Sequence, residues 1–209
     1  PIPQRPDTLR ILGIGNSFTD DGMMYLPELL EAAGIRNVVL GRLYIGGCSL
    51  ERHCREYAAG NTSYIYSKST DNRWETVSKK ATLLDGLTDE QWDVVVLQQA
   101  SGKSGMYQTY RPWFDRLAEI VRWHCPNAGA CIAWQQTWAY ARNSEHRDFG
   151  RYEKSQRLMY DAITASVGQL LADTSVEVVI PSGTAIQDLR ATELCDSLDL
   201  TRDGYHLSL

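Results

Sequence analysis

Short apolar runs alternate along this chain with stretches whose apolar residues recur at helical spacing. The apolar runs lie at 9–14, 37–43, 93–98, 129–134 and 176–180. The helical stretches lie at 24–33, 111–123, 154–171 and 184–194, with shorter ones after Ser49 and at 83–92. Strands that alternate with helices form a mostly parallel sheet that helices cover on both faces. The pattern therefore predicts an α/β protein, a three-layer α/β/α sandwich around a five-stranded, mostly parallel sheet.

One segment departs from this alternation. Residues 60–80 contain two short β-like runs, at 64–66 and 74–77, separated by polar residues. Such a pattern is typical of a β-hairpin. We expect a hairpin insertion at about 60–80 within a single domain spanning 1–209, because a chain of 209 residues suits one domain.

The first apolar run ends in a glycine-containing turn that carries polar residues. Gly13 and Gly15 are expected to adopt backbone angles that a Cβ would forbid, and Asn16, Ser17 and Thr19 are turn and N-cap types. The helical pattern at 24–33 follows. We therefore expect Ser17 on a tight strand-to-helix turn, which lifts its hydroxyl clear of the sheet.

Other interpretations of this turn are a nucleotide site or a plain helix cap. A dinucleotide fingerprint needs a third glycine where Phe18 stands, and the lysine of a phosphate-binding loop is missing. Ser17 could still be only an N-cap. The other end of the chain favours a catalytic role for Ser17, because Asp203 and His206 are three residues apart in a turn-rich segment. That spacing lets a carboxylate fix the tautomer of an imidazole whose other nitrogen faces a serine.

These segments together resemble the SGNH (GDSL-like) hydrolase superfamily. Its first block appears as Gly15-Asn-Ser-Phe18, its second-block glycine matches Gly46-Gly47, and its last block is Asp203-Gly-Tyr-His206. The resemblance implies a flavodoxin-like fold without cofactor or metal. It also implies a catalytic triad of Ser17, His206 and Asp203 whose oxyanion hole includes the N–H groups of Ser17 and Gly47.

The third block of that superfamily is altered here. Most members have Gly-x-Asn-Asp after the third strand, whereas this chain has Leu97-Gln-Gln-Ala-Ser101. Some carbohydrate-esterase branches resemble it better, since they use His-Gln-Gly-Glu there and the glutamine serves as oxyanion donor. Alignment with them assigns the donor to Gln99, and a slip of one residue would assign it to Gln98.

The following strand end carries Trp134, Gln135 and Trp138, which we assign to substrate binding. Tryptophan rings at a strand's carboxyl end could stack on a sugar, although they could equally belong to the core. With the glutamine block, they favour an acylated carbohydrate as substrate. The prediction is a serine esterase that removes a small acyl group, most simply acetyl. The alternatives are a catalytically silent carbohydrate-binding protein, an amidase, or a lipid-directed esterase or thioesterase.

The net charge and the cysteine content limit the binding partners and metal sites to be expected. A net charge of −5 argues against nucleic acid, and no apolar run approaches the ~18 residues of a membrane span. Five cysteines favour buried thiols, with one disulfide or a zinc site as alternatives.

His146 is expected to face solvent. The segment 1–6 is expected to be an extended lead-in, and removal of a signal peptide before Pro1 would favour a periplasmic or secreted location. The oligomeric state is left open.

Overall fold

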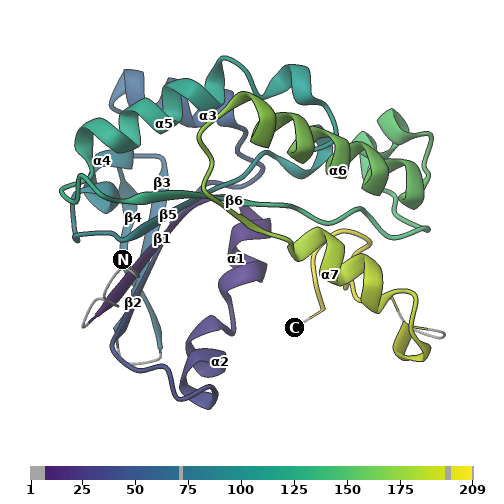
Figure 1. Cartoon of the computed structure of the whole chain (residues 1–209), viewed down its shortest axis with the longest axis horizontal. Coiled ribbons are helices and arrows are strands. Elements are labelled where there is room, and N and C mark those ends of the chain that lie inside the picture. Colours follow the sequence, from purple (N-terminus) through teal and green to yellow (C-terminus); the bar gives the residue numbers. More distant parts are fainter. Residues whose placement is uncertain (1–7, 71–72, 196–198, 209) are drawn as a thin grey trace.

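The core of the molecule is a seven-stranded sheet in the order β4-β3-β2-β1-β5-β6-β7 (Figure 1). The computed structural model describes residues 8–70, 73–195 and 199–208, so the lead-in predicted at 1–6 and the hairpin positions 71–72 lie outside the described residues. The strands are β1 Leu9–Gly15, β2 Val38–Tyr44, β3 Tyr64–Ser69, β4 Trp74–Ala81, β5 Val94–Leu97, β6 Cys131–Gln135 and β7 Val178–Ile180.

Five of these strands are parallel, as the sequence predicts. The strands β2, β1, β5, β6 and β7 run parallel, whereas β3 and β4 are antiparallel. The two additional strands are the hairpin, which extends the sheet because β3 pairs with β2. The predicted α/β class is confirmed.

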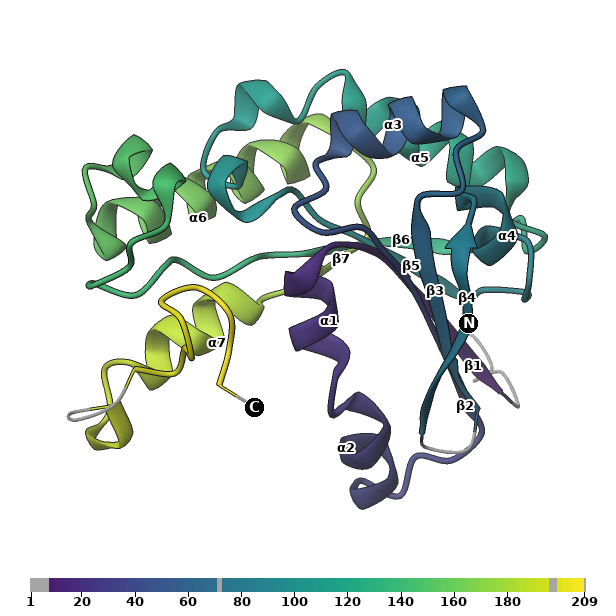
Figure 2. The same ribbon diagram turned by 180° about the vertical axis from the view of Figure 1, so that it is seen from behind.

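Helices cover both faces of the sheet (Figures 1 and 2). One face carries α1, α2 and α7, and the other carries α3, α4, α5 and α6. Their bounds are α1 Ser17–Met23, α2 Leu26–Ala32, α3 Leu50–Ala59, α4 Leu83–Leu87, α5 Trp113–His124, α6 Gln156–Asp173 and α7 Ser182–Leu189.

Local sequence signals explain where several helices begin. The side chains of Ser49, Thr82 and Ser155 accept hydrogen bonds from backbone N–H groups at the starts of α3, α4 and α6. Such caps satisfy donors that have no intrahelical partner. Gly60 ends α3 with a φ of 62°, a left-handed conformation that suits a residue without Cβ.

The order of the parallel strands determines where a cleft forms. From β1 the chain first adds β2 on one side and later β5, β6 and β7 on the other. In open parallel sheets a crevice forms at the carboxyl ends of the strands where this direction changes. That point lies between β1 and β5, directly beside Ser17.

The described residues show five free thiols, of which Cys48, Cys54 and Cys125 are buried. Within the same residues, no group of three or more His, Cys, Asp or Glu side chains gathers as metal ligands would.

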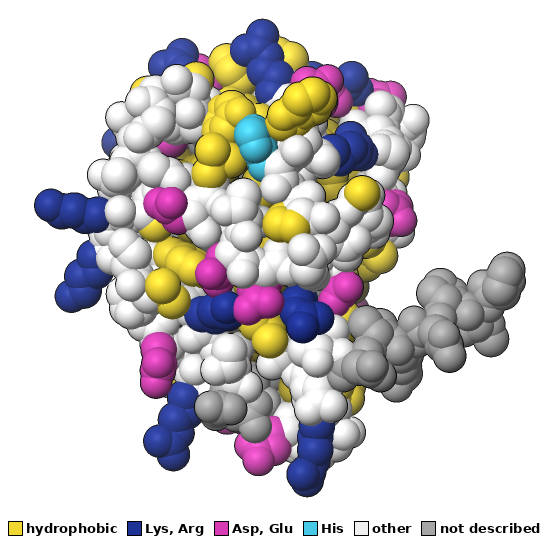
Figure 3. All heavy atoms as spheres, turned by 90° about the vertical axis from the view of Figure 1, so that its left-hand side faces the viewer, with side chains coloured by type: hydrophobic (Ala, Val, Ile, Leu, Met, Phe, Trp, Pro, Cys, Tyr) yellow, Lys and Arg dark blue, Asp and Glu magenta, His cyan; other side chains and the backbone are white. Residues whose placement is uncertain are grey.

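No helix in the described ranges combines the length and apolar character needed to cross a bilayer. Acidic and basic side chains are interspersed on the face in Figure 3, so that face carries no broad patch of one charge.

A buried histidine in α3 should make the stability depend on pH. His53 is fully buried, its Nδ1 lies 2.9 Å from the Tyr64 hydroxyl, and burial lowers its pKa from 6.5 to about 3. Between those values the unfolded chain binds a proton that the folded chain excludes. The contribution of neutral His53 to the free energy of unfolding is therefore complete above pH 6.5 and is lost as the pH falls towards 3.

We expect the free energy of unfolding of the parent protein to fall by ~2 kcal/mol between pH 7 and pH 5 through this group. Urea unfolding at both pH values should show that His53→Phe lacks this part of the pH dependence. His124→Gln on α5 is the control for removing one histidine. An identical pH dependence in the parent and His53→Phe would contradict the assignment.

Candidate active site

Ser17 occupies the turn predicted for it, between the central strand β1 and the helix α1. Asn16 caps α1, since its Oδ1 accepts from the N–H of Phe18 at 3.0 Å. Its Nδ2 donates to the Cys48 carbonyl oxygen at 2.9 Å, which ties this turn to the loop after β2. Ser17 is therefore held between two fixed segments while its own side chain remains partly exposed.

The two glycines before Ser17 are required for close packing. A Cβ on Gly15 would lie 2.0 Å from Thr19 Oγ1, and one on Gly13 would lie 2.6 Å from Met23 Sδ. Neither glycine has a positive φ, so the sequence-based expectation of forbidden backbone angles is wrong. Their role is to let α1 lie directly against β1, which sets the position of Ser17.

His206 and Asp203 lie next to this serine. His206 Nε2 is 2.7 Å from Ser17 Oγ, and His206 Nδ1 is 2.6 Å from Asp203 Oδ2. Asp203 Oδ1 also accepts the backbone N–H of His206 at 2.8 Å and that of Tyr205 at 3.2 Å. One carboxylate thus shapes the turn and orients the ring that the turn carries.

The hydrogen bonds to Asp203 control its ionisation. Burial alone would raise the pKa of this carboxyl, but the backbone N–H of His206, the His206 ring and the Tyr205 N–H stabilise the anion and lower the pKa overall. Asp203 is therefore ionised at neutral pH. An ionised Asp203 accepts the Nδ1 proton of His206 and leaves Nε2 free to accept from Ser17.

The loop of His206 is attached to α1 by a buried carboxylate. Asp21, one helical turn after Ser17, accepts the N–H of Leu207 at 2.9 Å and pairs with Arg202 at 3.1 Å. The Asp21 side chain is only 3% exposed. Two further bonds reach the same loop, from Trp138 Nε1 to the Tyr205 carbonyl at 2.7 Å and from the Ala141 N–H to the Gly204 carbonyl at 2.8 Å.

The three residues open into a pocket of about 320 Å³. Its walls are residues 16–18 after β1, the end of β2 with Tyr44, Gly46 and Gly47, residues 100–102 after β5, residues 146–148 beyond β6, and residues 205–206. Gly47 has a φ of 61°, which favours glycine. Within the described part of the chain, the backbone N–H groups of Ser17 and Gly47 have no hydrogen-bond partner, so both can bind a ligand.

The glutamine pair after β5 does not line this pocket. Gln99 donates to the Thr109 carbonyl at 3.0 Å and accepts from the N–H of Leu50 at 3.1 Å. Gln98 donates to Asn16 Oδ1 at 2.6 Å. Both side chains are about 1% exposed. The geometry corrects the assignment of either glutamine as an oxyanion donor, because both amide groups bind other protein groups and support the loops that form the pocket.

The residues assigned to substrate binding, at the end of β6 and just after it, are also buried. Trp134 packs against Tyr110 and Phe114 in the core, and Trp138 stacks on Phe18 with the ring centroids 4.3 Å apart. Neither indole is more than 1% exposed, so neither has a free face for a sugar. Gln135 donates to the Phe18 carbonyl at 3.2 Å. Trp138 and Gln135 thus support Phe18 beside the serine, whereas Trp134 belongs to the core, which corrects the assignment of these residues as a binding platform.

Sequence reasoning missed three residues at this site: Asp21, Tyr205 and His146. Asp21 could have been found, because an acid four residues after Ser17 lies on the same side of a helix. Tyr205 lies between the triad residues in sequence, and its ring centroid is 4.2 Å from that of His206. His146 is half-buried against the pocket rather than facing solvent.

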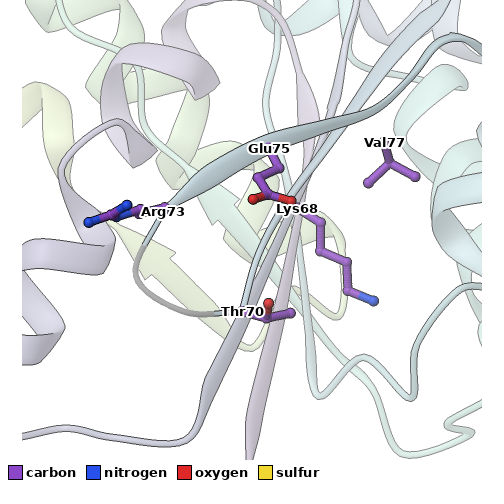
Figure 4. Close-up of a pocket in the computed structure, with 5 residues that line it drawn as sticks. All are labelled: Lys68, Thr70, Arg73, Glu75 and Val77. Atoms are coloured by element: carbon purple, nitrogen blue, oxygen red, sulfur yellow. The ribbon is translucent and has the colours of Figure 1, made fainter.

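A second hollow lies on the hairpin, where Figure 4 shows Lys68, Thr70, Arg73, Glu75 and Val77. The ammonium of Lys68 binds Asp89 at 2.8 Å and also contacts Glu90. This hollow therefore presents surface ion pairs and does not combine a nucleophile with a base.

The fold of this chain is the one found in structures of SGNH hydrolases. The chain overlays on a proposed SGNH hydrolase from Slackia heliotrinireducens with a TM-score of 0.56 and 23% identity, over 97% of this chain and 91% of that one. An acetyl xylan esterase, AlAXEase, gives a TM-score of 0.52 and 14% identity, over 96% and 92% of the two chains. At these identities the likeness establishes the fold alone.

The family match identifies this chain more specifically than the likeness in fold does. Residues 10–209 match the model of DUF4886, a domain of unknown function, and the chain belongs to that family. A DUF4886 family protein from Bacteroides uniformis ATCC 8492 has a TM-score of 0.90 and 38% identity, over 97% of this chain and 77% of that one. No curated protein matches the chain.

The attachment through Asp21 predicts a specific defect. Asp21→Ala leaves the Leu207 N–H without its acceptor and Arg202 without its carboxylate partner, so the His206 loop can shift relative to Ser17. We expect hydrolysis of p-nitrophenyl acetate to lose ~10–100-fold in kcat/KM, because a misplacement of about 1 Å can cost ~10²-fold.

Asp20→Ala is the matched control, since Asp20 is the neighbouring acid on α1 and pairs with Arg42 at 3.5 Å instead. It should change kcat/KM by less than ~3-fold, because the partner of Asp20 is the largely buried Arg42 and not the His206 loop, so its loss acts on stability. Thermal unfolding of both variants separates loss of fold from loss of positioning. Equal losses of activity in the two variants would count against the role of Asp21.

Proposed function

We propose that this protein is a serine esterase that removes a small acyl group, most simply acetyl, from a carbohydrate ester. The observation that carries the proposal is the chain of contacts from Ser17 Oγ to His206 Nε2 at 2.7 Å and from His206 Nδ1 to Asp203 at 2.6 Å. These distances lie within the range over which a base can take a proton from a nucleophile.

The reaction follows from the roles of these groups. Ser17 Oγ attacks the ester carbonyl carbon while His206 Nε2 accepts the hydroxyl proton. The resulting imidazolium is stabilised by the ionised Asp203. His206 then donates the proton to the departing alcohol oxygen, and an acyl-enzyme on Ser17 remains. Water attacks this acyl-enzyme with His206 again as base, which releases the carboxylic acid and restores the serine.

Each tetrahedral intermediate carries a negatively charged oxygen, which requires hydrogen-bond donors directed at it. The backbone N–H groups of Ser17 and Gly47 are suited to this role, because both lie at the pocket and neither has another partner among the described residues. The Asn16 bond to the Cys48 carbonyl joins the two segments that carry these donors. Donors held in this way need little reorganisation when the charge forms.

The size and lining of the pocket favour a small, polar ester. About 320 Å³ accommodates an acetyl group and part of an alcohol, and backbone groups, hydroxyls and imidazoles contribute to the walls. The fold shared with an acetyl xylan esterase is consistent with this choice. A catalytically silent sugar-binding protein receives less support, because such a protein would not need the contact of His206 Nε2 with Ser17 Oγ.

The serine mechanism makes a direct prediction. Ser17→Ala removes the nucleophile and His206→Ala removes the base, so each should lower kcat for p-nitrophenyl acetate by at least ~10³-fold. Ser101→Ala is the matched control, because Ser101 lines the same pocket but its hydroxyl contacts Tyr140 at 2.8 Å. It should keep kcat within about tenfold of the parent. Parent-like turnover in Ser17→Ala would exclude this mechanism.

The buried glutamine gives a second test. Gln99→Ala leaves the N–H of Leu50 unpaired, so we expect a loss of ~1–3 kcal/mol in the free energy of unfolding. Loss of a direct oxyanion donor would instead lower kcat by ~10²–10³-fold. Urea unfolding and steady-state kinetics on the same preparation distinguish the two effects. A large kcat loss at unchanged stability would restore Gln99 as the donor.

A further inference from the structure

A second histidine, His146, lies at the same pocket as Ser17 and His206 but makes no contact with the triad's reacting atoms. It caps a short 3₁₀ helix at Arg147–Tyr152, and its Nδ1 accepts the backbone N–H of Asp148 at 3.1 Å. A ring nitrogen that accepts a hydrogen bond carries a lone pair. In the neutral ring the proton must therefore be on Nε2.

The ring packs against two tyrosines, whose own ring centroids are 5.8 Å apart. Its centroid is 4.7 Å from that of Tyr140 and 4.7 Å from that of Tyr205. Its own backbone N–H donates to Ser144 Oγ at 3.3 Å. Partial burial lowers the pKa of His146, which favours the neutral ring. Among the described residues nothing accepts from Nε2, which leaves an oriented N–H donor at the pocket.

The topology indicates which part of an ester this donor would meet. The two N–H groups suited to the oxyanion lie after β1 and β2, whereas His146 lies beyond β6, on the other side of β1. Tyr205 contacts both His146 and His206, so the two histidines share one side of the pocket. In the proposed reaction His206 gives its proton to the leaving alcohol, which must therefore lie on that same side.

We propose that His146 is a substrate-binding residue whose Nε2–H donates to a second oxygen of the alcohol portion of the ester. This inference rests on the proposed esterase function and extends it. The donor makes the site selective for esters of polyhydroxy alcohols such as sugars, and adds nothing for esters of simple alcohols, which offer no second oxygen.

Two variants separate the donor from the packing of the ring. His146→Phe keeps an aromatic ring packed against Tyr140 and Tyr205 but loses the N–H. His146→Gln loses the ring but can place an amide donor at a similar reach. Each is compared with the parent on glucose pentaacetate, which has further acceptor oxygens, and on ethyl acetate, which has none beyond the ester itself.

We expect His146→Phe to lower kcat/KM for glucose pentaacetate by about 3- to 10-fold, the scale of one uncharged hydrogen bond. Its kcat/KM for ethyl acetate should stay within about twofold of the parent, and His146→Gln should recover part of the loss on the sugar ester. Equal changes on both substrates, or a parent-like Phe variant beside an impaired Gln variant, would overturn the inference. Failure of the proposed function looks different, since Ser17→Ala would then hydrolyse both esters as fast as the parent and both proposals would fall.

Discussion

The candidate site depends on one buried carboxylate that joins the two ends of the chain. Asp21 binds the N–H of Leu207 and the guanidinium of Arg202, across separations of 186 and 181 residues in sequence. Residues 201–208 contain no helix or strand longer than an isolated bridge, so their position is not fixed by a sheet ladder or a helix. Ordering such a segment costs about 1–2 kcal/mol of backbone entropy per residue, which contacts of this kind must offset.

The two halves of the proposed triad are consequently held in different ways. Ser17 follows the central strand of the sheet and begins a helix that two glycines bring into contact with that strand. His206 instead relies on side-chain bonds from Asp21 and Trp138, on one backbone bond from Ala141 to Gly204, and on the internal bonds of Asp203. Side-chain bonds can be removed one at a time, whereas a strand in the middle of a sheet cannot. The precision of the Ser17–His206 contact is therefore decided on the histidine side.

The sequence sufficed for the parts of the fold and site that local patterns control. Apolar periodicity located the five parallel strands and the major helices, and the spacing of Asp203 and His206 anticipated their hydrogen bond. The sequence did not predict the roles of residues that depend on how closely the elements pack. Trp134 and Trp138 stand at a strand end in either interpretation, and only the packing of α5 and Phe18 encloses them. Gly13 and Gly15 were assigned to unusual backbone angles because the sequence cannot reveal how closely α1 approaches β1.

The glutamine pair shows how a site can depend on residues that never enter it. Gln99 links Thr109 to the start of α3, and α3 follows the turn that contains Gly47. Gln98 binds the same Asn16 oxygen that caps the serine helix. Each glutamine thus supports one of the two segments whose N–H groups are suited to an oxyanion. The two glutamines therefore act on the site through the segments they hold in place, and not through contact with a ligand.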